Sequence, residues 1–345
     1  MTPVRFAIVG AGLIGARHAK AIAQAEEAEL VAIADPAPGA AALARTLGVA
    51  QFDTLDALID AKICDAVYLC TPTAMHGQGA RACIAAGLPV LVEKPLESDI
   101  PAARAMVAEA EAAGVPLLTG HHRRHNPLIA AAKSEIENGA LGRIVSAHAM
   151  FWLMKPDDYF DVPWRRAPGA GPILTNLAHD LDLMRHLVGE VASVEALGSN
   201  AIRGHAVEET CVVSFAFANG ALGTANISDS IVAPWSWEMT AGENPAYPVT
   251  GESCYQIGGT QGALDLPSGR IWGHPGKRSW WEPIQARMSP RAGGDPLVLQ
   301  AEQFARVVSR GEAPLVSGRE GLRTIELLDA ILRSIESGKR IHLQE

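Results

Sequence analysis

The sequence lacks several patterns that identify particular classes of protein. Its 345 residues hold five cysteines, with no Cys-x-x-Cys pair. This odd, sparse set argues against a disulfide framework or a zinc ribbon and favours reduced thiols in a cytoplasmic protein. No apolar run reaches the roughly 18 residues of a membrane span, and the first residues lack the pattern of a signal peptide. With 29 basic against 38 acidic residues and no long basic block, we do not expect a nucleic-acid partner.

The sequence does contain enough apolar residues for a large core. Hydrophobic residues make up 48% of the chain and charged residues 19%, and the length suggests two domains. Over the first 120 residues, short apolar runs alternate with segments of helical spacing. We expect strands at 4–9, 30–34, 65–70, 89–92 and 115–119, and helices at 13–25, 40–47, 54–60, 75–86 and 98–113, the last capped by Ser98. This alternation predicts βαβ crossovers and a parallel sheet that is covered on both faces.

The pattern changes after residue 125. A helix at 127–138 precedes a long strand at 143–153, a polar loop at 155–172 and a helix at 174–187. Strands are expected at 191–201, 208–217 and 221–231, with Asn219-Gly220 as a hairpin turn, and shorter ones at 236–241, 254–258, 262–266 and 270–272. A connector at 289–296 leads to helices at 297–309 and 319–337. These features predict an α+β domain with a large, open, mostly antiparallel sheet. We therefore expect two domains, at 1–122 and 123–345.

The most informative motif is Gly10-Ala11-Gly12-Leu13-Ile14-Gly15, which lies between a predicted strand and a predicted helix. The first glycine allows a tight turn, the second lets the backbone approach a pyrophosphate, and the third lets the helix pack on the strand. Asp35 ends the next strand, where its carboxylate can bind ribose hydroxyls and would repel a 2′-phosphate. The motif predicts a site for NAD, with NADP less favoured. The alternative is a glycine turn without a ligand.

Two further segments follow predicted strands of the same sheet. Thr71-Pro72-Thr73, with His76 in the next turn, and Glu93-Lys94-Pro95 lie where an open parallel sheet binds ligands. Lys94 would be partly desolvated beside a nicotinamide, where it can hydrogen-bond a substrate hydroxyl and help remove its proton. The alternatives are ordinary helix capping by Thr73 and a solvated surface charge at Lys94.

These segments resemble the glucose–fructose oxidoreductase, inositol dehydrogenase and rhizopine-catabolism (Gfo/Idh/MocA) family. The resemblance continues through residues 120–127, Trp164-Arg165 and residues 171–182, and so covers most of the chain. It implies an N-terminal Rossmann domain and a C-terminal domain whose open sheet often forms an oligomer interface, so we expect a homodimer or homotetramer. It also implies hydride transfer between NAD(P) and a carbinol of a sugar, polyol or sugar-acid-like small molecule.

The resemblance also assigns residues. Lys94 and His179 correspond to the catalytic pair, with His179 as general base for alcohol oxidation. Many relatives carry Asp four residues before this histidine, where this chain has Thr175, and this argues against a plain inositol dehydrogenase. The cofactor-binding residues are expected to be Gly10, Gly12, Leu13, Ile14, Gly15, Asp35, Thr71, Pro72, Thr73, His76, Glu93, Lys94, Trp164 and Arg165. The substrate-binding residues are expected to be Lys94, His122, Arg124, Arg165, Asn176 and His179.

Arginines near the predicted site bear on the class of substrate. Their guanidinium groups can bind a carboxylated substrate with paired hydrogen bonds. The alternatives are that they bind the cofactor or pair with Asp157, Asp158 and Asp161. The arginines concerned are Arg123, Arg124, Arg165 and Arg166. The histidines at 121, 122 and 125, with His179 and Asp182, form a possible ligand set, but the predicted hydride chemistry needs no metal, so we expect none.

The features together predict an NAD-dependent oxidoreductase that acts on CH-OH groups, with substrate bound between the two domains. Two alternatives remain. One is an NAD-dependent glycoside hydrolase that oxidises its substrate transiently and shows no net turnover of cofactor. The other is a non-catalytic sensor that binds NAD and a sugar, which the presence of both Lys94 and His179 disfavours.

Overall fold

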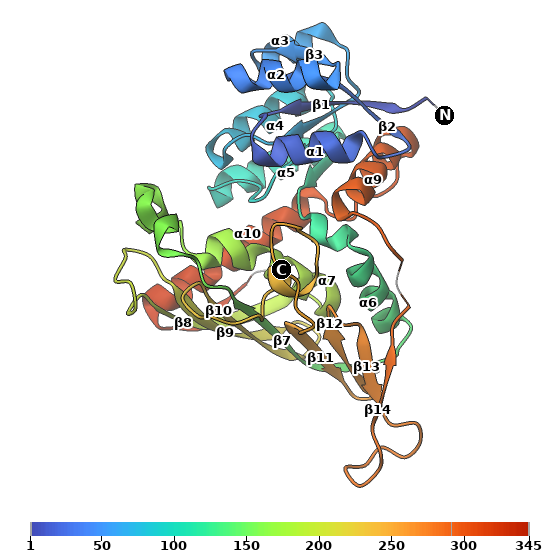
Figure 1. The fold of residues 1–345 in the computed structure, drawn as a ribbon, viewed down its shortest axis with the longest axis vertical. Coiled ribbons are helices and arrows are strands. Elements are labelled where there is room, and N and C mark those ends of the chain that lie inside the picture. The colour runs from blue at the N-terminus through green and yellow to red at the C-terminus, as the bar shows by residue number, and fades with distance from the viewer. Residues whose placement is uncertain (1, 291, 344–345) are drawn as a thin grey trace. The chain divides into compact units, whose positions relative to one another are not determined.

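The computed structural model describes residues 2–290 and 292–343, and these fall into two compact units (Figure 1). The first unit holds the described residues up to Asn126 together with Gly294–Ile325. The second holds the described residues of Pro127–Gly293 and those from Glu326 on. Among the described residues, no helix has both the length and the apolar character needed to cross a membrane.

The first unit is built on a six-stranded parallel sheet in the order β3-β2-β1-β4-β5-β6. This order places the point where the strand order reverses between β1 and β4, which is the ligand-binding position of doubly wound sheets. The predicted α/β fold of this part is confirmed, although β3 was not expected from the sequence. The strands are β1 (Val4–Val9), β2 (Ala28–Ala34), β3 (Ala50–Phe52), β4 (Ala66–Leu69), β5 (Val90–Val92) and β6 (Leu117–Thr119).

Helices cover both faces of this sheet, as the continuous apolar strands require. One face packs against α1 (Leu13–Ile22), α2 (Pro38–Leu47) and α9 (Pro296–Arg310). The other packs against α3 (Leu55–Ala61), α4 (His76–Ala85), α5 (Ile100–Ala113) and the start of α10 (Gly318–Ser337). The cap of α5 is Asp99, whose Oδ1 accepts the amide of Ala102 at 2.8 Å, so the expected cap at Ser98 is wrong by one residue.

Helix α9 belongs to the first unit, although it lies far along the chain. Phe304 is fully buried, with its ring 5.1 Å from that of Phe6 and 5.4 Å from that of Tyr68. The apolar face of α9 therefore packs on the side chains that β1 and β4 present on one face of the sheet. The expected division into 1–122 and 123–345 therefore needs correction, because Gly294–Ile325 return to the first unit.

The second unit contains a nine-stranded sheet in the order β14-β13-β12-β11-β7-β10-β9-β8-β15. Strands β7 and β10 pair in parallel, and the other named pairs are antiparallel, as the mostly antiparallel sheet predicted from the sequence requires. The strands are β7 (Ile144–Trp152), β8 (Val191–Ser199), β9 (Thr210–Phe217), β10 (Leu222–Ser228), β11 (Tyr255–Gly259), β12 (Gly262–Leu266), β13 (Arg270–Gly273), β14 (Gln285–Met288) and β15 (Ile341–His342).

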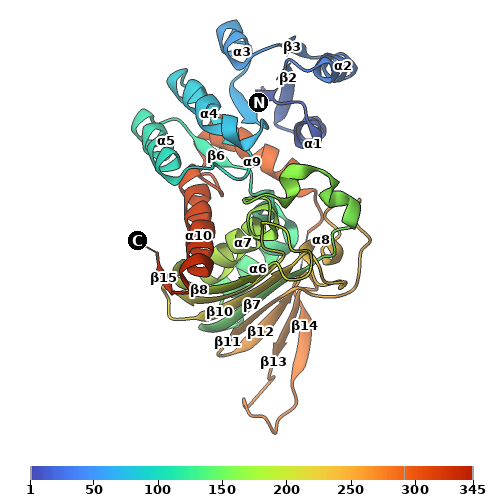
Figure 2. The ribbon, with the colours of Figure 1, turned by 90° about the vertical axis from the view of Figure 1, so that its left-hand side faces the viewer.

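Helices α6 (Pro127–Glu137) and α7 (Ala178–Val188) cover one face of this sheet, as Figure 2 shows, and the end of α10 packs on the same core. Residues 236–241 form no strand. They form the short helix α8 (Trp237–Thr240), whose cap Ser236 accepts the amide of Met239 at 3.3 Å. The alternating apolar residues of this segment were misleading, because Trp237 is buried in a stack on the ring of Tyr255 and not in a sheet.

Candidate functional site

A cavity of about 790 Å³ opens at the carboxyl ends of β1, β2 and β4 in the first unit. Its lining includes five of the residues predicted to bind the cofactor, namely Gly10, Gly12, Asp35, Thr71 and Pro72. Further lining residues, among them Asp53, Leu55, Met75 and Gln78, were not found from the sequence. They lie in loops and first turns whose side chains carry no recognisable motif. The volume and placement suit a small-molecule or cofactor site.

The three motif glycines differ in what surrounds them. Gly10 has a φ of 96°, and a Cβ there would lie 2.6 Å from the carbonyl oxygen of Cys70. A Cβ on Gly15 would lie 2.0 Å from the carbonyl oxygen of Gly10, so the helix can approach the strand only without a side chain. A Cβ on Gly12 would meet nothing within 4 Å. The fold itself therefore needs the first and third glycines, and the second faces open space.

Asp35 anchors the backbone around the mouth of the cavity. Its Oδ2 accepts the amide of Ala11 at 2.7 Å, and its Oδ1 accepts the amide of Ala37 at 2.7 Å. One carboxylate thus links the glycine loop to the residues after β2. Asp53 and Asp56 also line the cavity, so this end of the site is lined by three acidic side chains.

Two features of the cavity fit a bound dinucleotide. The Oγ1 of Thr71 is buried and has no hydrogen-bond partner among the described residues, so a ligand can satisfy it. No side chain caps the N-terminus of α1, which leaves its first amide groups to face an anion. Leu13, the first residue of α1, is 86% exposed, and Ile14 packs partly against the core.

The other predicted cofactor residues of β4 and its loop lie at the start of the following helix. Thr73 begins a 3₁₀ turn, Thr73–Met75, that leads into α4. His76 is buried, with Nε2 2.8 Å from the carbonyl oxygen of Thr71 and Nδ1 2.9 Å from that of Pro95. It is absent from the cavity lining and connects the loops that follow β4 and β5.

Glu93 and Lys94 directly follow β5. The Oε2 of Glu93 accepts the amide of Lys94 at 3.0 Å, and its Oε1 lies 2.7 Å from Nε2 of the buried His18. Burial alone would raise the pKa of the Glu93 carboxyl. The hydrogen bond and charge of His18, with the nearby charges of His122 and Lys94, outweigh it and lower the pKa below its ordinary value.

The basic segment after β6 forms a 3₁₀ turn, His122–His125, and its arginines are mostly buried. The guanidinium of Arg124 binds Oε2 of Glu320 at 2.7 Å and approaches the carbonyl oxygen of Leu315 at 3.5 Å. These contacts within the first unit account for its burial. His122 is half-buried, and its nearby charge helps to lower the pKa of the Glu93 carboxyl. Across residues 2–290 and 292–343, no group of three or more His, Cys, Asp or Glu is placed to hold a metal ion.

In the second unit, His179 lies in the first turn of α7 and is 7% exposed. The chain enters α7 through a π-helical turn, Ile173–Leu177, that carries Thr175 and Asn176. The hydroxyl of Thr175 lies 2.9 Å from both the carbonyl oxygen of Gly171 and Oδ1 of Asn176. Next to His179, Asp180 accepts a hydrogen bond from the hydroxyl of Tyr255. This turn and the start of α7 therefore carry two of the predicted site residues, Asn176 and His179, together with Thr175, the residue that departs from the family pattern.

The remaining predicted residues lie in the loop before this turn. Trp164 is exposed, and the guanidinium of Arg165 packs over the ring of Tyr159 at 4.2 Å and donates to its carbonyl oxygen at 2.8 Å. Nearby, Lys155 pairs with Asp229 at 3.1 Å. This ion pair was not found from the sequence, because its members are 74 residues apart in the chain.

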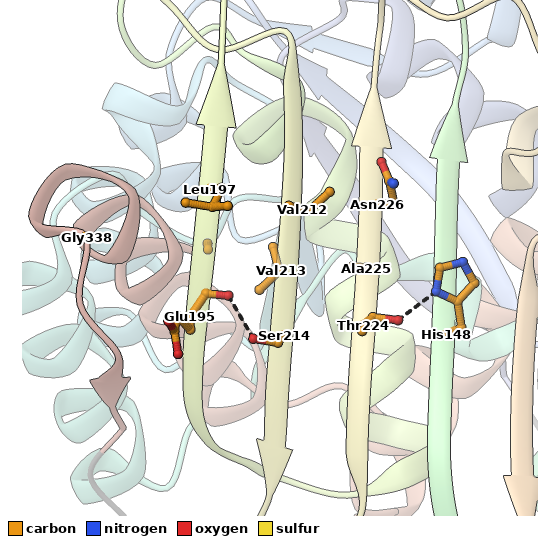
Figure 3. Close-up of a pocket in the computed structure, with 11 residues that line it drawn as sticks. His148, Glu195, Leu197, Val212, Val213, Ser214, Thr224, Ala225, Asn226 and Gly338 are labelled. Atoms are coloured by element: carbon orange, nitrogen blue, oxygen red, sulfur yellow. Dashed lines mark hydrogen bonds between the residues drawn. The ribbon is translucent and has the colours of Figure 1, made fainter.

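The face of the nine-stranded sheet opposite α6 and α7 carries a second, smaller cavity of about 470 Å³ (Figure 3). Side chains from β8, β9, β10 and β7 line it, and His148 Nδ1 lies 2.8 Å from Oγ1 of Thr224 across two of these strands. Leu197 and Leu222 expose most of their side-chain surface on this sheet.

Comparison with known proteins agrees with this architecture. Residues 4–121 match the model of an oxidoreductase family with an NAD-binding Rossmann fold, and residues 129–265 match the Gfo/Idh/MocA C-terminal domain. An inositol 2-dehydrogenase of Rhizobium meliloti (strain 1021) is 28% identical over 99% of both chains. The rhizopine catabolism protein MocA of Rhizobium meliloti is 30% identical over 62% of this chain and 69% of its own.

A solved structure is similar over the full length as well. The WlbA dehydrogenase of Bordetella pertussis, in complex with NADH and UDP-GlcNAcA, is 27% identical, with a TM-score of 0.78 over 99% of each chain. The sequence matches span both units, and the glycine loop, the Glu93-Lys94 segment and the turn of His179 all fall within the matched residues. The chain belongs to the Gfo/Idh/MocA family of NAD(P)-dependent oxidoreductases.

Proposed function

We propose that this protein oxidises a secondary alcohol of a sugar, polyol or sugar acid and passes the hydride to NAD. The observation that carries the proposal is the cavity at the β1–β4 switch point, followed one strand later by Glu93-Lys94. A Lys placed after the neighbouring strand of a cofactor-binding sheet is suited to contact the alcohol that reacts. Family membership supports the reaction type.

In this proposal Lys94 and His179 are the two acid–base groups. When bound, NAD would supply the acceptor for the hydride of the carbinol carbon. Lys94 donates a hydrogen bond to the substrate oxygen and stabilises the charge that develops on it. His179 takes the hydroxyl proton, and in the reverse direction it returns that proton. His122, Arg124, Arg165 and Asn176 are proposed to position the substrate, while Trp164, Arg165 and Glu93 complete the cofactor site with the residues of the cavity.

We propose that NAD is preferred over NADP. Asp35 is held by two amides at the end of β2, and Asp53 and Asp56 line the same cavity. A 2′-phosphate entering there would meet three acidic side chains without a basic side chain in the lining. Ribose hydroxyls, in contrast, can donate to these carboxylates.

The substrate class rests on relatives and on one departure from the family pattern. The relatives with whole-chain similarity include an inositol 2-dehydrogenase, and the WlbA structure is a complex with NADH and UDP-GlcNAcA. Thr175 stands where many relatives have Asp, and a hydroxyl cannot serve as a carboxylate base. We therefore propose a substrate whose oxidation needs only Lys94 and His179 as acid–base groups. Neutral polyols are the first class to test, and sugar acids are the second.

The test is the absorbance of NADH at 340 nm with purified protein, NAD⁺ or NADP⁺, and a panel of inositols, aldoses, sugar acids and carboxylated cyclic diols. Lys94→Ala and His179→Ala are expected to abolish the activity. Their matched controls, Lys20→Ala and His342→Ala, replace exposed residues of the same types and are expected to keep it.

The proposal would be contradicted if no compound of the panel gave a change in absorbance at 340 nm, or if Lys94→Ala kept full activity. Release of a leaving group from a glycoside without net NADH would replace the dehydrogenase with an NAD-dependent hydrolase. Binding of NADH without chemistry on any compound would favour a sensor.

We also propose a homodimer or homotetramer in the cytoplasm, formed through the face of the nine-stranded sheet opposite α6 and α7. The cavity of Figure 3 and the exposed Leu197 and Leu222 support this surface as the contact. Light scattering at micromolar concentration is expected to give an even multiple of the monomer mass. Leu222→Asp should reduce that mass, whereas Val249→Asp, at an exposed loop position away from the sheet, should not. A monomer mass for the unchanged protein would contradict the proposal.

A further inference from the structure

We propose that two buried histidines, His18 and His76, are positioning residues that hold the backbone on either side of Lys94. The inference rests on the proposed role of Lys94 in the reaction. Neither histidine needs to touch substrate. His18 binds Glu93, the residue before Lys94, and His76 binds Pro95, the residue after it. The backbone from which the lysine side chain extends is therefore held in place.

On the N-terminal side, the connection runs from α1 through a carboxylate to the backbone of Lys94. His18 is 1% exposed, and its Nε2 lies 2.7 Å from Oε1 of Glu93. The other carboxylate oxygen of Glu93 accepts the amide of Lys94 at 3.0 Å. A buried carboxylate needs a charged or hydrogen-bonding partner at each oxygen, and this arrangement gives it one.

The surroundings leave the carboxylate of Glu93 little freedom to move. A Cβ on Gly120 would lie 2.9 Å from its Oε1, so the backbone of Gly120 is already close against it. The ring of His18 lies 5.0 Å from that of Tyr68, which is fully buried in the sheet. The imidazole is therefore held by an aromatic neighbour, and the carboxylate is held by the imidazole and by backbone.

On the C-terminal side, His76 connects the next residue to a neighbouring strand. Its Nδ1 lies 2.9 Å from the carbonyl oxygen of Pro95, and its Nε2 lies 2.8 Å from that of Thr71. Thr71 lines the cavity of the first unit. The ring therefore fixes the spacing between the loop that carries Lys94 and a loop of the cofactor cavity.

These contacts explain two histidines that the chemistry of hydride transfer does not require. Both are buried, both lie in the first unit outside the cavity lining, and both bind the segment 93–95, while His76 also binds Thr71 of the lining. A shift of about 1 Å in a reacting group can cost about 10²-fold in rate. Loosening either contact should therefore lower kcat by a larger factor than it raises KM for NAD⁺.

The experiment compares His18→Ala, His18→Gln and His76→Ala with the unchanged protein. Gln at 18 can place an amide N–H near Oε1 of Glu93, which Ala cannot. Phe304→Leu is the matched control, because it removes volume from the same aromatic cluster without touching Glu93. The measurements are kcat and KM for NAD⁺ on the panel compound that turns over fastest. Hydrogen exchange of the peptide that contains Lys94 is followed in the protein without ligands.

His18→Ala and His76→Ala are expected to lower kcat by about 10²-fold and to raise KM for NAD⁺ by a smaller factor, which is larger in His76→Ala because that ring also holds Thr71 of the cavity lining. Exchange should rise in the Lys94 peptide and not in a peptide from β10. His18→Gln should recover most of the rate and the protection, and Phe304→Leu should alter neither.

Three results would overturn the inference: His18→Ala with normal kcat, unchanged exchange near Lys94, or a loss in Phe304→Leu equal to that in His18→Ala. The exchange measurement needs no substrate, so it stands even if no panel compound reacts. Full activity in Lys94→Ala would instead refute the proposed function.

Discussion

Replacing each motif glycine by alanine should separate the glycines that the fold needs from the one that the cofactor needs. Gly12 has a φ of −67°, which alanine adopts, and its added Cβ would meet nothing within 4 Å. We expect Gly12→Ala to leave the free energy of unfolding unchanged or to raise it by about 0.4–1 kcal/mol. The new methyl group would occupy the space proposed for the pyrophosphate, so the Kd for NADH should rise by about tenfold or more, about 1.4 kcal/mol.

Gly15→Ala and Gly10→Ala should behave in the opposite way. The Cβ at 15 would lie 2.0 Å from the carbonyl oxygen of Gly10, which the strand holds in place. Overpacking of a core typically costs about 1–3 kcal/mol, and a contact with fixed backbone should reach about 3 kcal/mol or more. At Gly10, the φ of 96° adds about 1–2 kcal/mol of backbone strain to a contact of 2.6 Å with Cys70.

The assay is urea denaturation without cofactor, followed by titration of NADH fluorescence on whatever remains folded. Gly39→Ala is the control, because it lies in α2 with nothing within 4 Å of its Cβ and outside the cavity lining. It should leave the Kd for NADH unchanged and, like Gly12→Ala, leave the free energy of unfolding unchanged or raise it by about 0.4–1 kcal/mol. The reasoning is refuted if Gly12→Ala destabilises the protein as much as Gly15→Ala, or if it binds NADH as tightly as the unchanged protein.

Four further predictions test other parts of the account. Asp35→Asn should lower the ratio of kcat/KM for NAD⁺ to that for NADP⁺ by at least about tenfold, since it removes a charge that repels phosphate; an unchanged ratio contradicts the assignment. Phe304→Ala, at a fully buried ring, should cost about 3–5 kcal/mol in urea unfolding if α9 packs on the first unit, and far less if it does not. The five buried thiols should resist Ellman's reagent at pH 8 until the protein is unfolded, because burial raises the pKa of Cys83 and Cys211 to about 12; rapid native labelling would show them accessible. The pKa of Glu93 lies below its unfolded value of 4.5, so its pairing stabilises the fold above that value and is lost as the pH falls toward the folded pKa. In Glu93→Gln the free energy of unfolding should therefore fall less steeply as the pH decreases below 4.5, and an unchanged pH dependence would contradict this.

The first unit was predictable because its signals are local. Each of the strands expected there is a short apolar run that ends in a turn residue, and the glycine motif predicts which strand and helix lie beside the cofactor. The alternation of strands and helices predicts a parallel sheet, but it predicts neither β3 nor the order of the strands. It does not extend to α9, whose Phe304 packs on Phe6 and Tyr68, 298 and 236 residues earlier in the chain. Amphipathic spacing predicts a helix there but not the sheet that it covers.

The second unit was harder to predict where tertiary contacts decide the local structure. Ser236 to Thr240 alternates in a way that is typical of a strand, yet Trp237 is buried against Tyr255, and Ser236 caps a short helix. Edge strands such as β15, with two residues, gain their identity from pairing with β8. The ion pair of Lys155 with Asp229 also joins distant segments. No local pattern carries information about such contacts.

The π-helical turn before His179 changes how the departure at Thr175 should be understood. In a regular α-helix, residues four apart share a face, so the spacing suggests that Thr175 points where a relative's Asp would point. Here the turn carries i to i+5 geometry, and the Thr175 hydroxyl lies at hydrogen-bond distance from the carbonyl oxygen of Gly171. A hydroxyl bound to its own backbone is poorly placed to orient substrate. Proton transfer in the proposed reaction then depends on His179 and Lys94 alone, and for this reason contacts that fix Lys94, through Glu93, should matter more here than in relatives with a third acid–base group.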